Sequence, residues 1–243
     1  MSHLDQHPDT ARPAALPDAP GRAPVESVVG ATAIALAISL LAQNAIAALT
    51  DPPTYAAPMS DVLAYHAHNP IPVGIAVGLE ALNLPLLLGF VSGLHGLVGR
   101  RRAASAVWSR LGAAAAASLT AIMVAYAVLW IGVVLAAGRL TEPTPLLEIV
   151  WRMHAAAFAF SLPALGTTLL GAALATHTTR LTARWQLVLG VVSAALLIAA
   201  GTVSLAIADG SPILFVGLAG YAGWIVWLLA SGVRLVRTRG DQA

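Results

Sequence analysis

The sequence predicts an all-α fold: a polytopic membrane helix bundle of six transmembrane helices, with both termini cytoplasmic. Hydrophobic residues make up 58% of the chain and charged residues only 10%, whereas a soluble domain carries about 25% charged residues. The mean hydropathy is +0.80. Six apolar stretches are long enough to cross a bilayer, and arginines collect at alternate ends of these stretches.

The composition also excludes several classes of function. All 13 basic residues are arginines, and the chain contains no cysteine. We therefore expect no disulfide, no thiolate nucleophile and no metal held by cysteine. Because the arginines lie at the borders of apolar stretches, they indicate a lipid bilayer as partner and no nucleic acid.

The first predicted span follows a long proline-rich tail. Residues 1–26 hold five prolines and four acids, a composition typical of a disordered cytoplasmic segment. The span itself covers Ser27–Leu49 and becomes polar only near its end, at Gln43 and Asn44. Residues 50–70 then form a predicted loop rich in proline, aspartate and histidine.

The second span, Ile71–Val98, is the most informative stretch of the sequence. Its one charged side chain is Glu80, roughly 13 Å along the helix from Ile71 at ~1.5 Å per residue. Asn83 follows on the same face at a spacing of three residues. An ionisable group at that depth is expensive and marks a functional site by default.

Four further spans complete the predicted bundle. They are Leu111–Ala137, Met153–Thr176, Trp185–Ala208 and Ile213–Leu235. The transmembrane domain therefore covers residues 27–236, and residues 237–243 form a short cytoplasmic tail. Trp108, Trp151 and Trp185 fall at the expected membrane interfaces, where amphipathic rings are favourable.

The distribution of arginines predicts the orientation. Eleven of the 13 lie in the tails or in the second and fourth loops, and only Arg139 and Arg152 lie on the other side. Short loops rich in arginine face the cytoplasm. We therefore expect a multi-pass protein of a bacterial cell membrane with both termini inside.

This orientation brings several polar side chains to one depth. Gln43, Asn44, Glu80 and Asn83 lie in the outer half, Arg152 and His154 open the fourth span, and Asp209 follows the fifth. These groups could converge on an outward-facing pocket. We expect Glu80 to be neutral there, because Arg152 can extend its long side chain towards water instead of reaching inward.

Three functions stay open at this point. In the first, the pocket binds or moves a small or lipid-like ligand held by Gln43, Asn44, Asn83 and Arg152, while Glu80 exchanges a proton or pairs with a cation. In the second, Glu80 is the general acid of an enzyme acting on an isoprenoid-like substrate, with Asp209 or His154 as second catalytic group. The third is a structural subunit; a homo-oligomer fits all three.

The histidines do not form a convincing metal motif. His66 and His68 are separated by one residue in a predicted loop, and His154 lies far away in the chain. A zinc site needs three or four ligands with defined supporting contacts. We expect no metal and no cofactor, and we interpret His66 and His68 as solvated loop residues.

The layout resembles that of a broad family of uncharacterised six-span bacterial membrane proteins. The resemblance rests on Glu80-x-x-Asn83 in the second span with the arginine cluster that follows, and on the basic loop Thr179–Trp185. It covers residues 27–237. It implies a six-helix bundle and no established activity.

Overall fold

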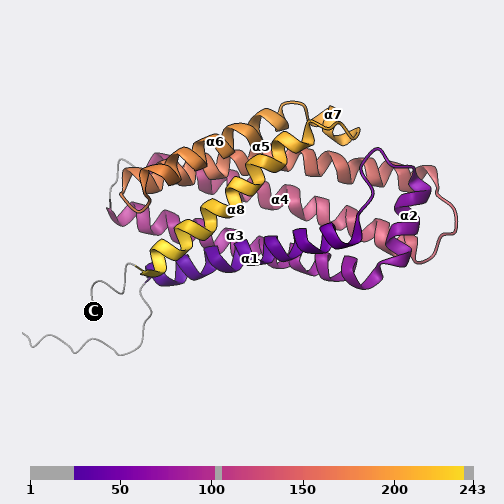
Figure 1. Ribbon diagram of the computed structural model, residues 1–243, viewed down its shortest axis with the longest axis horizontal. Coiled ribbons are helices and arrows are strands. Elements are labelled where there is room, and N and C mark those ends of the chain that lie inside the picture. The colour runs from indigo at the N-terminus through magenta and orange to yellow at the C-terminus, as the bar shows by residue number, and fades with distance from the viewer. Residues whose placement is uncertain (1–24, 102–105, 238–243) are drawn as a thin grey trace, which may run out of the picture.

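The fold is a bundle of long antiparallel helices (Figure 1). The computed structural model describes residues 25–101 and 106–237, and within these ranges it contains eight helices and no strand. Six helices are long and apolar enough to span a membrane, which confirms the predicted fold class. They are α1 (Val25–Thr50), α3 (Pro70–Arg101), α4 (Ala106–Ala137), α5 (Pro145–Thr178), α6 (Arg184–Gly201) and α8 (Leu214–Arg237).

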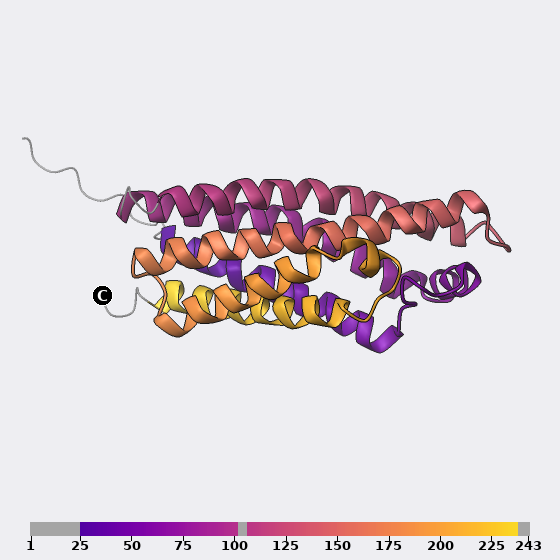
Figure 2. The same ribbon diagram turned by 90° about the horizontal axis from the view of Figure 1, so that it is seen from above.

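The six long helices form a closed ring of neighbours. In order around the ring, α1 packs against α3, α3 against α4, α4 against α5, α5 against α6, α6 against α8, and α8 against α1. Helices α3 and α5, which flank α4 in the ring, scarcely touch each other. The short helices α2 (Met59–His68) and α7 (Ser204–Ala208) lie at the same end of the bundle (Figures 1 and 2).

The predicted tails fall almost entirely outside the described residues. Helix α1 begins at Val25, slightly before the predicted start, and α8 continues to Arg237. The expected disorder of residues 1–26 therefore concerns described structure only at Val25 and Glu26, which are helical.

The fourth span begins earlier than predicted. Helix α5 starts at Pro145, where the Thr144 hydroxyl accepts a hydrogen bond from the Leu147 backbone N–H. A threonine cap followed by proline at the first helical position is a strong start signal. The sequence placed the start of this span too far along the chain, because hydropathy falls around Glu148 and Arg152. Both of these side chains project outward from the helix.

The predicted fifth span is interrupted before its end. Helix α6 stops at Gly201, whose backbone lies against the ring of Pro163 on α5, so that a side chain at this position would clash. The chain then turns through Thr202 and Val203 and forms α7. Hydropathy cannot detect this break, because residues on both sides of it are apolar.

The predicted loop 50–70 contains a helix. Helix α2 buries Val62, Leu63 and His66 on one face, and this face packs on α4 and α5 in a small apolar cluster that includes Val133 and Trp151. Trp151 is therefore 7% exposed, so its ring packs inside the bundle, while its depth in a membrane stays a prediction. The helix is too short to span a membrane and covers one end of the bundle.

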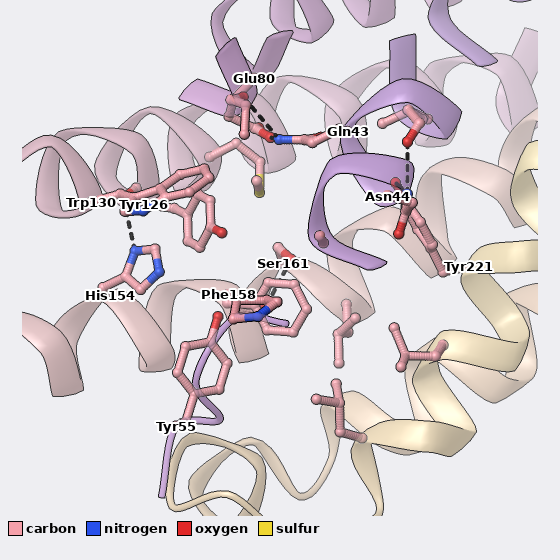
Figure 3. A pocket seen from close by; sticks show the side chains of 18 of the residues that line it. Gln43, Asn44, Tyr55, Glu80, Tyr126, Trp130, His154, Phe158, Ser161 and Tyr221 are labelled. Atoms are coloured by element: carbon pink, nitrogen blue, oxygen red, sulfur yellow. Dashed lines mark hydrogen bonds between the residues drawn. The ribbon is translucent and has the colours of Figure 1, made fainter. Parts of the chain in front are cut away.

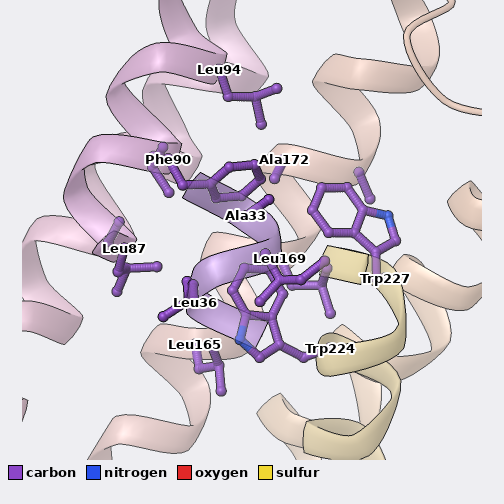
Figure 4. Close-up of a cluster of buried hydrophobic side chains, with 14 of the residues drawn as sticks. Ala33, Leu36, Leu87, Phe90, Leu94, Leu165, Leu169, Ala172, Trp224 and Trp227 are labelled. Carbon is purple, nitrogen blue, oxygen red and sulfur yellow. The ribbon is translucent and has the colours of Figure 1, made fainter. Parts of the chain in front are cut away.

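The main hydrophobic core lies between the long helices (Figure 4), and most of its residues belong to the half of the bundle away from α2. Phe90 of α3 meets Trp227 of α8 at a ring-centroid distance of 6.2 Å, and Trp227 stacks on Trp224 at 5.8 Å. Leu169 of α5 is fully buried in the same cluster. Dense packing thus closes the half of the ring that lies away from α2.

The two ends of the bundle differ in their basic residues. The end of α3, the turn between α5 and α6 and the end of α8 lie together (Figure 1), and they carry Arg101, Arg184 and Arg237. Arg139 and Arg152 lie at the end that carries α2. This grouping is the one assumed in the arginine count, while the orientation itself stays a prediction.

Candidate functional site

A cavity of about 630 Å³ lies in the half of the bundle that carries α2. Five of the six long helices contribute to its wall, the exception being α6. Residues 52–55, two side chains of α2 and residues 210–212 border it at the end of the bundle. We call this space the central cavity (Figure 3). Its volume is within the ~300–1,000 Å³ range of small-molecule sites.

One wall carries three polar side chains that are bonded in a row. Asn83 donates its amide N–H to Gln43 Oε1 at 3.3 Å, and Gln43 donates to Glu80 Oε2 at 2.9 Å. Gln43 also donates to the backbone carbonyl of Ala76 at 3.3 Å. We call Gln43, Glu80 and Asn83 the Glu80 cluster. Its hydrogen bonds run towards the carboxyl group, and the buried Asn83 Oδ1 has no partner.

The cluster arises from a simple helical register. Glu80 and Asn83 are three residues apart and face the same side of α3, while Gln43 reaches them from α1. Both α3 side chains are buried, at 6% and 5% exposure. The sequence identified all three residues and their common depth, and the structure brings them into direct contact.

Asn44 takes a separate path. Adjacent residues on a helix point about 100° apart, as 3.6 residues per turn requires, so Asn44 faces α8 while Gln43 faces α3. Its amide donates to the Tyr221 hydroxyl at 3.2 Å and to the Leu40 carbonyl at 2.7 Å. Tyr221 also lines the central cavity. The two neighbouring amides thus tie α1 to two different helices around the same space.

The far side of the cavity is an aromatic wall built from Tyr55, Tyr126, Trp130, Trp151 and Phe158, with His154 in its centre. Tyr55 and Phe158 lie across the space from Glu80 and Gln43 (Figure 3). The His154 ring stacks on Tyr126 at 4.1 Å and on Trp151 at 5.0 Å. Its Nδ1 atom lies 3.1 Å from the Tyr126 carbonyl oxygen. His154 is thus held as a packed ring within the wall.

Contrary to the prediction, His66 is a buried residue and not a solvated one. It is 4% exposed; its Nδ1 lies 2.7 Å from the Val62 carbonyl, and its Nε2 accepts from the Trp130 indole N–H at 3.1 Å. These two bonds require the neutral tautomer with the proton on Nδ1. Burial also lowers the pKa of His66. His68, by contrast, is exposed, although it belongs to α2 rather than to a loop.

Tyr55 is a cavity residue that the sequence analysis missed. It follows Pro52 and Pro53 in the connection after α1, and its ring packs 5.4 Å from Trp151 and 5.7 Å from Phe158. Burial raises the pKa of Tyr55 far above its usual range, and a hydrogen bond with the Tyr126 side chain offsets part of this effect. The sequence offered one indication of this role: an aromatic residue two positions after Pro53 in a connecting segment.

Arg152 and Asp209 meet each other at the rim and do not line the cavity. Arg152 Nη1 lies 3.3 Å from Asp209 Oδ1, and Nη2 lies 3.2 Å from Glu148 Oε1. The side chains are 60%, 79% and 55% exposed in the order Arg152, Asp209, Glu148. Arg152 therefore points outward, as expected for a side chain that reaches towards water. Of the predicted second catalytic groups, only His154 lines the cavity with Glu80.

Neither the donor groups nor the comparisons with known proteins identify a ligand. Within residues 25–101 and 106–237, no three histidine, aspartate or glutamate side chains gather closely enough to hold a metal ion. No family model matches the chain, and no curated protein or solved structure matches it. The resemblance to six-span bacterial membrane proteins stays a prediction.

Proposed function

We propose that this integral membrane protein binds a small, largely apolar ligand in the central cavity, with the polar end of the ligand at the Glu80 cluster. The observation that carries the proposal is the cavity itself. Protein interiors are close-packed, yet here a space of about 630 Å³ remains beside a dense core. Its wall is mainly apolar and aromatic and carries a small number of polar groups, among them the Glu80 cluster, the arrangement usual for small-molecule sites.

The arginine distribution supports an outward-facing site. Because the arginine-rich end lies opposite α2, the positive-inside rule directs the cavity end towards the outside of the cell membrane. The residues that cover this end are a short helix and irregular segments. A ligand arriving from the outer leaflet would meet the rim before it meets the main core.

Binding requires less of the site than the enzyme alternative does. A general acid needs a second acid or base close to the reacting atoms. The hydrogen-bond partner of Glu80 is the amide of Gln43, and Asp209 is engaged by Arg152 at the rim. His154 lines the cavity, but its ring is stacked between Tyr126 and Trp151 on the far wall. We therefore propose ligand binding, or movement of the ligand through this site, in preference to catalysis by Glu80.

Quenching of tryptophan fluorescence tests the proposal. Trp130, Trp151 and Trp224 line the cavity, and a bound bromophenyl group would quench them. The probe is the neutral 4-(4-bromophenyl)butan-1-ol, titrated into the purified full-length protein. We expect saturable quenching in the wild type and binding weakened about tenfold or more, equal to ~1.4 kcal/mol, in Ser161→Phe, whose larger side chain would occupy the cavity.

Ser118→Phe is the matched control. Both serine hydroxyls donate to a carbonyl of their own helix, Ser161 to Phe158 and Ser118 to Ala114, but Ser118 is exposed. The Ser118→Phe variant should therefore bind the probe as the wild type does. Leu84→Phe fills the cavity from α3 without adding a tryptophan to the signal, and it replaces Ser161→Phe if that variant does not fold. Equal, unsaturable quenching in the filled variants and the wild type would refute the proposal.

A further inference from the structure

The central cavity carries an uncompensated acid. Among the described residues that line it, Glu80 is the one carboxylic acid, and no arginine is present. Arg152, at the same end of the bundle, is exposed and bonded to Glu148 and Asp209. His66 uses both ring nitrogens in its neutral form. His154 is stacked between Tyr126 and Trp151 on the far wall. Among the described residues that line the cavity, the carboxyl group thus has no arginine as a partner.

The hydrogen bonds of the Glu80 cluster leave acceptors without donors. The amide N–H groups of Gln43 are directed at Glu80 and at the Ala76 carbonyl. The Gln43 oxygen is taken by Asn83, whose own oxygen is buried without a partner. What the cluster lacks is a hydrogen-bond donor. An ammonium group offers up to three and has no acceptor of its own.

Aromatic rings stand where they can face such a cation. Tyr126, Tyr221, Phe158 and Trp224 all line the same space as Glu80. The negative face of an aromatic ring attracts ammonium ions, more strongly where water is excluded. Beyond the rings, Leu84, Met123 and Leu162 leave room for an apolar body.

We infer that the ligand of the central cavity is a lipophilic organic amine, bound as the ammonium ion with its charge at Glu80 and its apolar part along the aromatic wall. This inference rests on the proposed function and names its ligand class. An ammonium and a carboxylate neutralise each other on binding, whichever protonation state the empty site favours. A neutral ligand would leave an acid in the cavity without a cation, and an anion would meet repulsion.

Three probes of one shape test the charge preference. They are 4-(4-bromophenyl)butylamine, the corresponding alcohol and the corresponding butanoate, measured by tryptophan quenching on the full-length protein. We expect the amine to bind about tenfold or more tighter than the alcohol, a factor equal to ~1.4 kcal/mol, and the butanoate not to saturate. In Glu80→Gln the amine and the alcohol should bind within about twofold of each other.

Two further variants isolate the role of Glu80. Glu148→Gln removes a carboxylate at the same end of the bundle, outside the cavity, and should keep the wild-type ratio of the two dissociation constants. Glu80→Asp keeps a carboxyl group and should retain a preference for the amine. Comparing this ratio between variants cancels the partitioning of the probes into micelles.

The outcomes separate the inference from the proposed function. Suppose that the alcohol binds saturably and that the ratio of the amine and alcohol dissociation constants is the same in the wild type and in Glu80→Gln. This result would overturn the amine inference and leave ligand binding intact. Butanoate binding as tight as amine binding would overturn it as well, even if Glu80→Gln failed to fold. If none of the probes saturates, the proposed function fails together with the inference.

Discussion

At the scale of single residues, buried polar groups in this protein obtain partners from distant parts of the chain. Glu80 receives its hydrogen bond from Gln43, and Trp130 donates to His66. Local sequence shows that Glu80 is costly in an apolar span, but it cannot show which residue reduces that cost. For the same reason Arg152 and Asp209, expected beside the pocket, form an exposed ion pair with each other.

The buried state of His66 predicts a dependence of stability on pH. Because burial lowers the pKa of His66 below its ordinary value of 6.5, acid protonates the unfolded chain before the folded one. The stabilisation is complete above about pH 6.5 and declines as pH falls towards the folded-state value. The thermal midpoint of the wild type should therefore decrease between pH 7.5 and pH 5.5.

His66→Gln and His68→Gln measured over the same range provide the comparison. The glutamine at position 66 cannot titrate, so the pH-dependent decrease should shrink. His68 is exposed on the same helix, and its replacement should leave the wild-type decrease unchanged. An identical decrease in all three proteins would show that acid acts at another group.

At the scale of helices, small residues set where backbones approach. Gly93 packs against Val29 of α1, whereas Gly74 and Gly78 of the same helix have no neighbouring atoms within reach of a Cβ. The tightest backbone contact joins α4 and α5: a Cβ on Gly171 would lie 2.6 Å from the Gly112 nitrogen. Such glycines look alike in the sequence, and only their surroundings distinguish them.

This difference predicts opposite effects of one substitution. Gly171→Ala should destabilise the protein by about 1–3 kcal/mol, because the added methyl group overlaps the backbone of α4. Gly78→Ala adds the same methyl group in open space and should stabilise by up to about 1 kcal/mol through helix propensity. Equilibrium unfolding in mixed micelles would measure both, and a shared sign would contradict the packing described for α4 and α5.

At the scale of the whole molecule, the bundle divides into a packed half and a hollow half. The packed half lies towards the arginine-rich end, and the central cavity lies towards α2. The positive-inside rule predicts that the hollow half faces outward. Under the proposed function, the orientation would determine which side of the membrane supplies the ligand.

Single cysteines in this cysteine-free chain test the orientation. Ser60 of α2 and Arg101 of α3 are both exposed and lie at opposite ends of the bundle. We expect Ser60→Cys to react with an impermeant thiol reagent added outside intact cells, and Arg101→Cys to react only after the cells are opened. Labelling of Arg101→Cys from outside would reverse the orientation and move the cavity to the cytoplasmic half.

The sequence by itself determined the class of fold and the position of its most expensive residue. Six apolar stretches of sufficient length predict membrane spans, because the bilayer requires backbone groups to bond within each helix. The same reasoning identifies Glu80 as exceptional and places Gln43 and Asn83 at its depth. These conclusions depend on composition and helical period alone.

Only the tertiary structure decided what surrounds Glu80. The aromatic wall comes from a connecting segment and two helices, and residues such as Tyr55 and Phe158 meet only after the chain has closed into a ring. The sequence predicted a loop in place of helix α2, because the apolar face of this helix is short and interrupted by histidines. A membrane span follows from the free energy of one segment in lipid, which its own sequence determines. A cavity forms where neighbouring helices leave space between them, and this space depends on how the whole bundle packs.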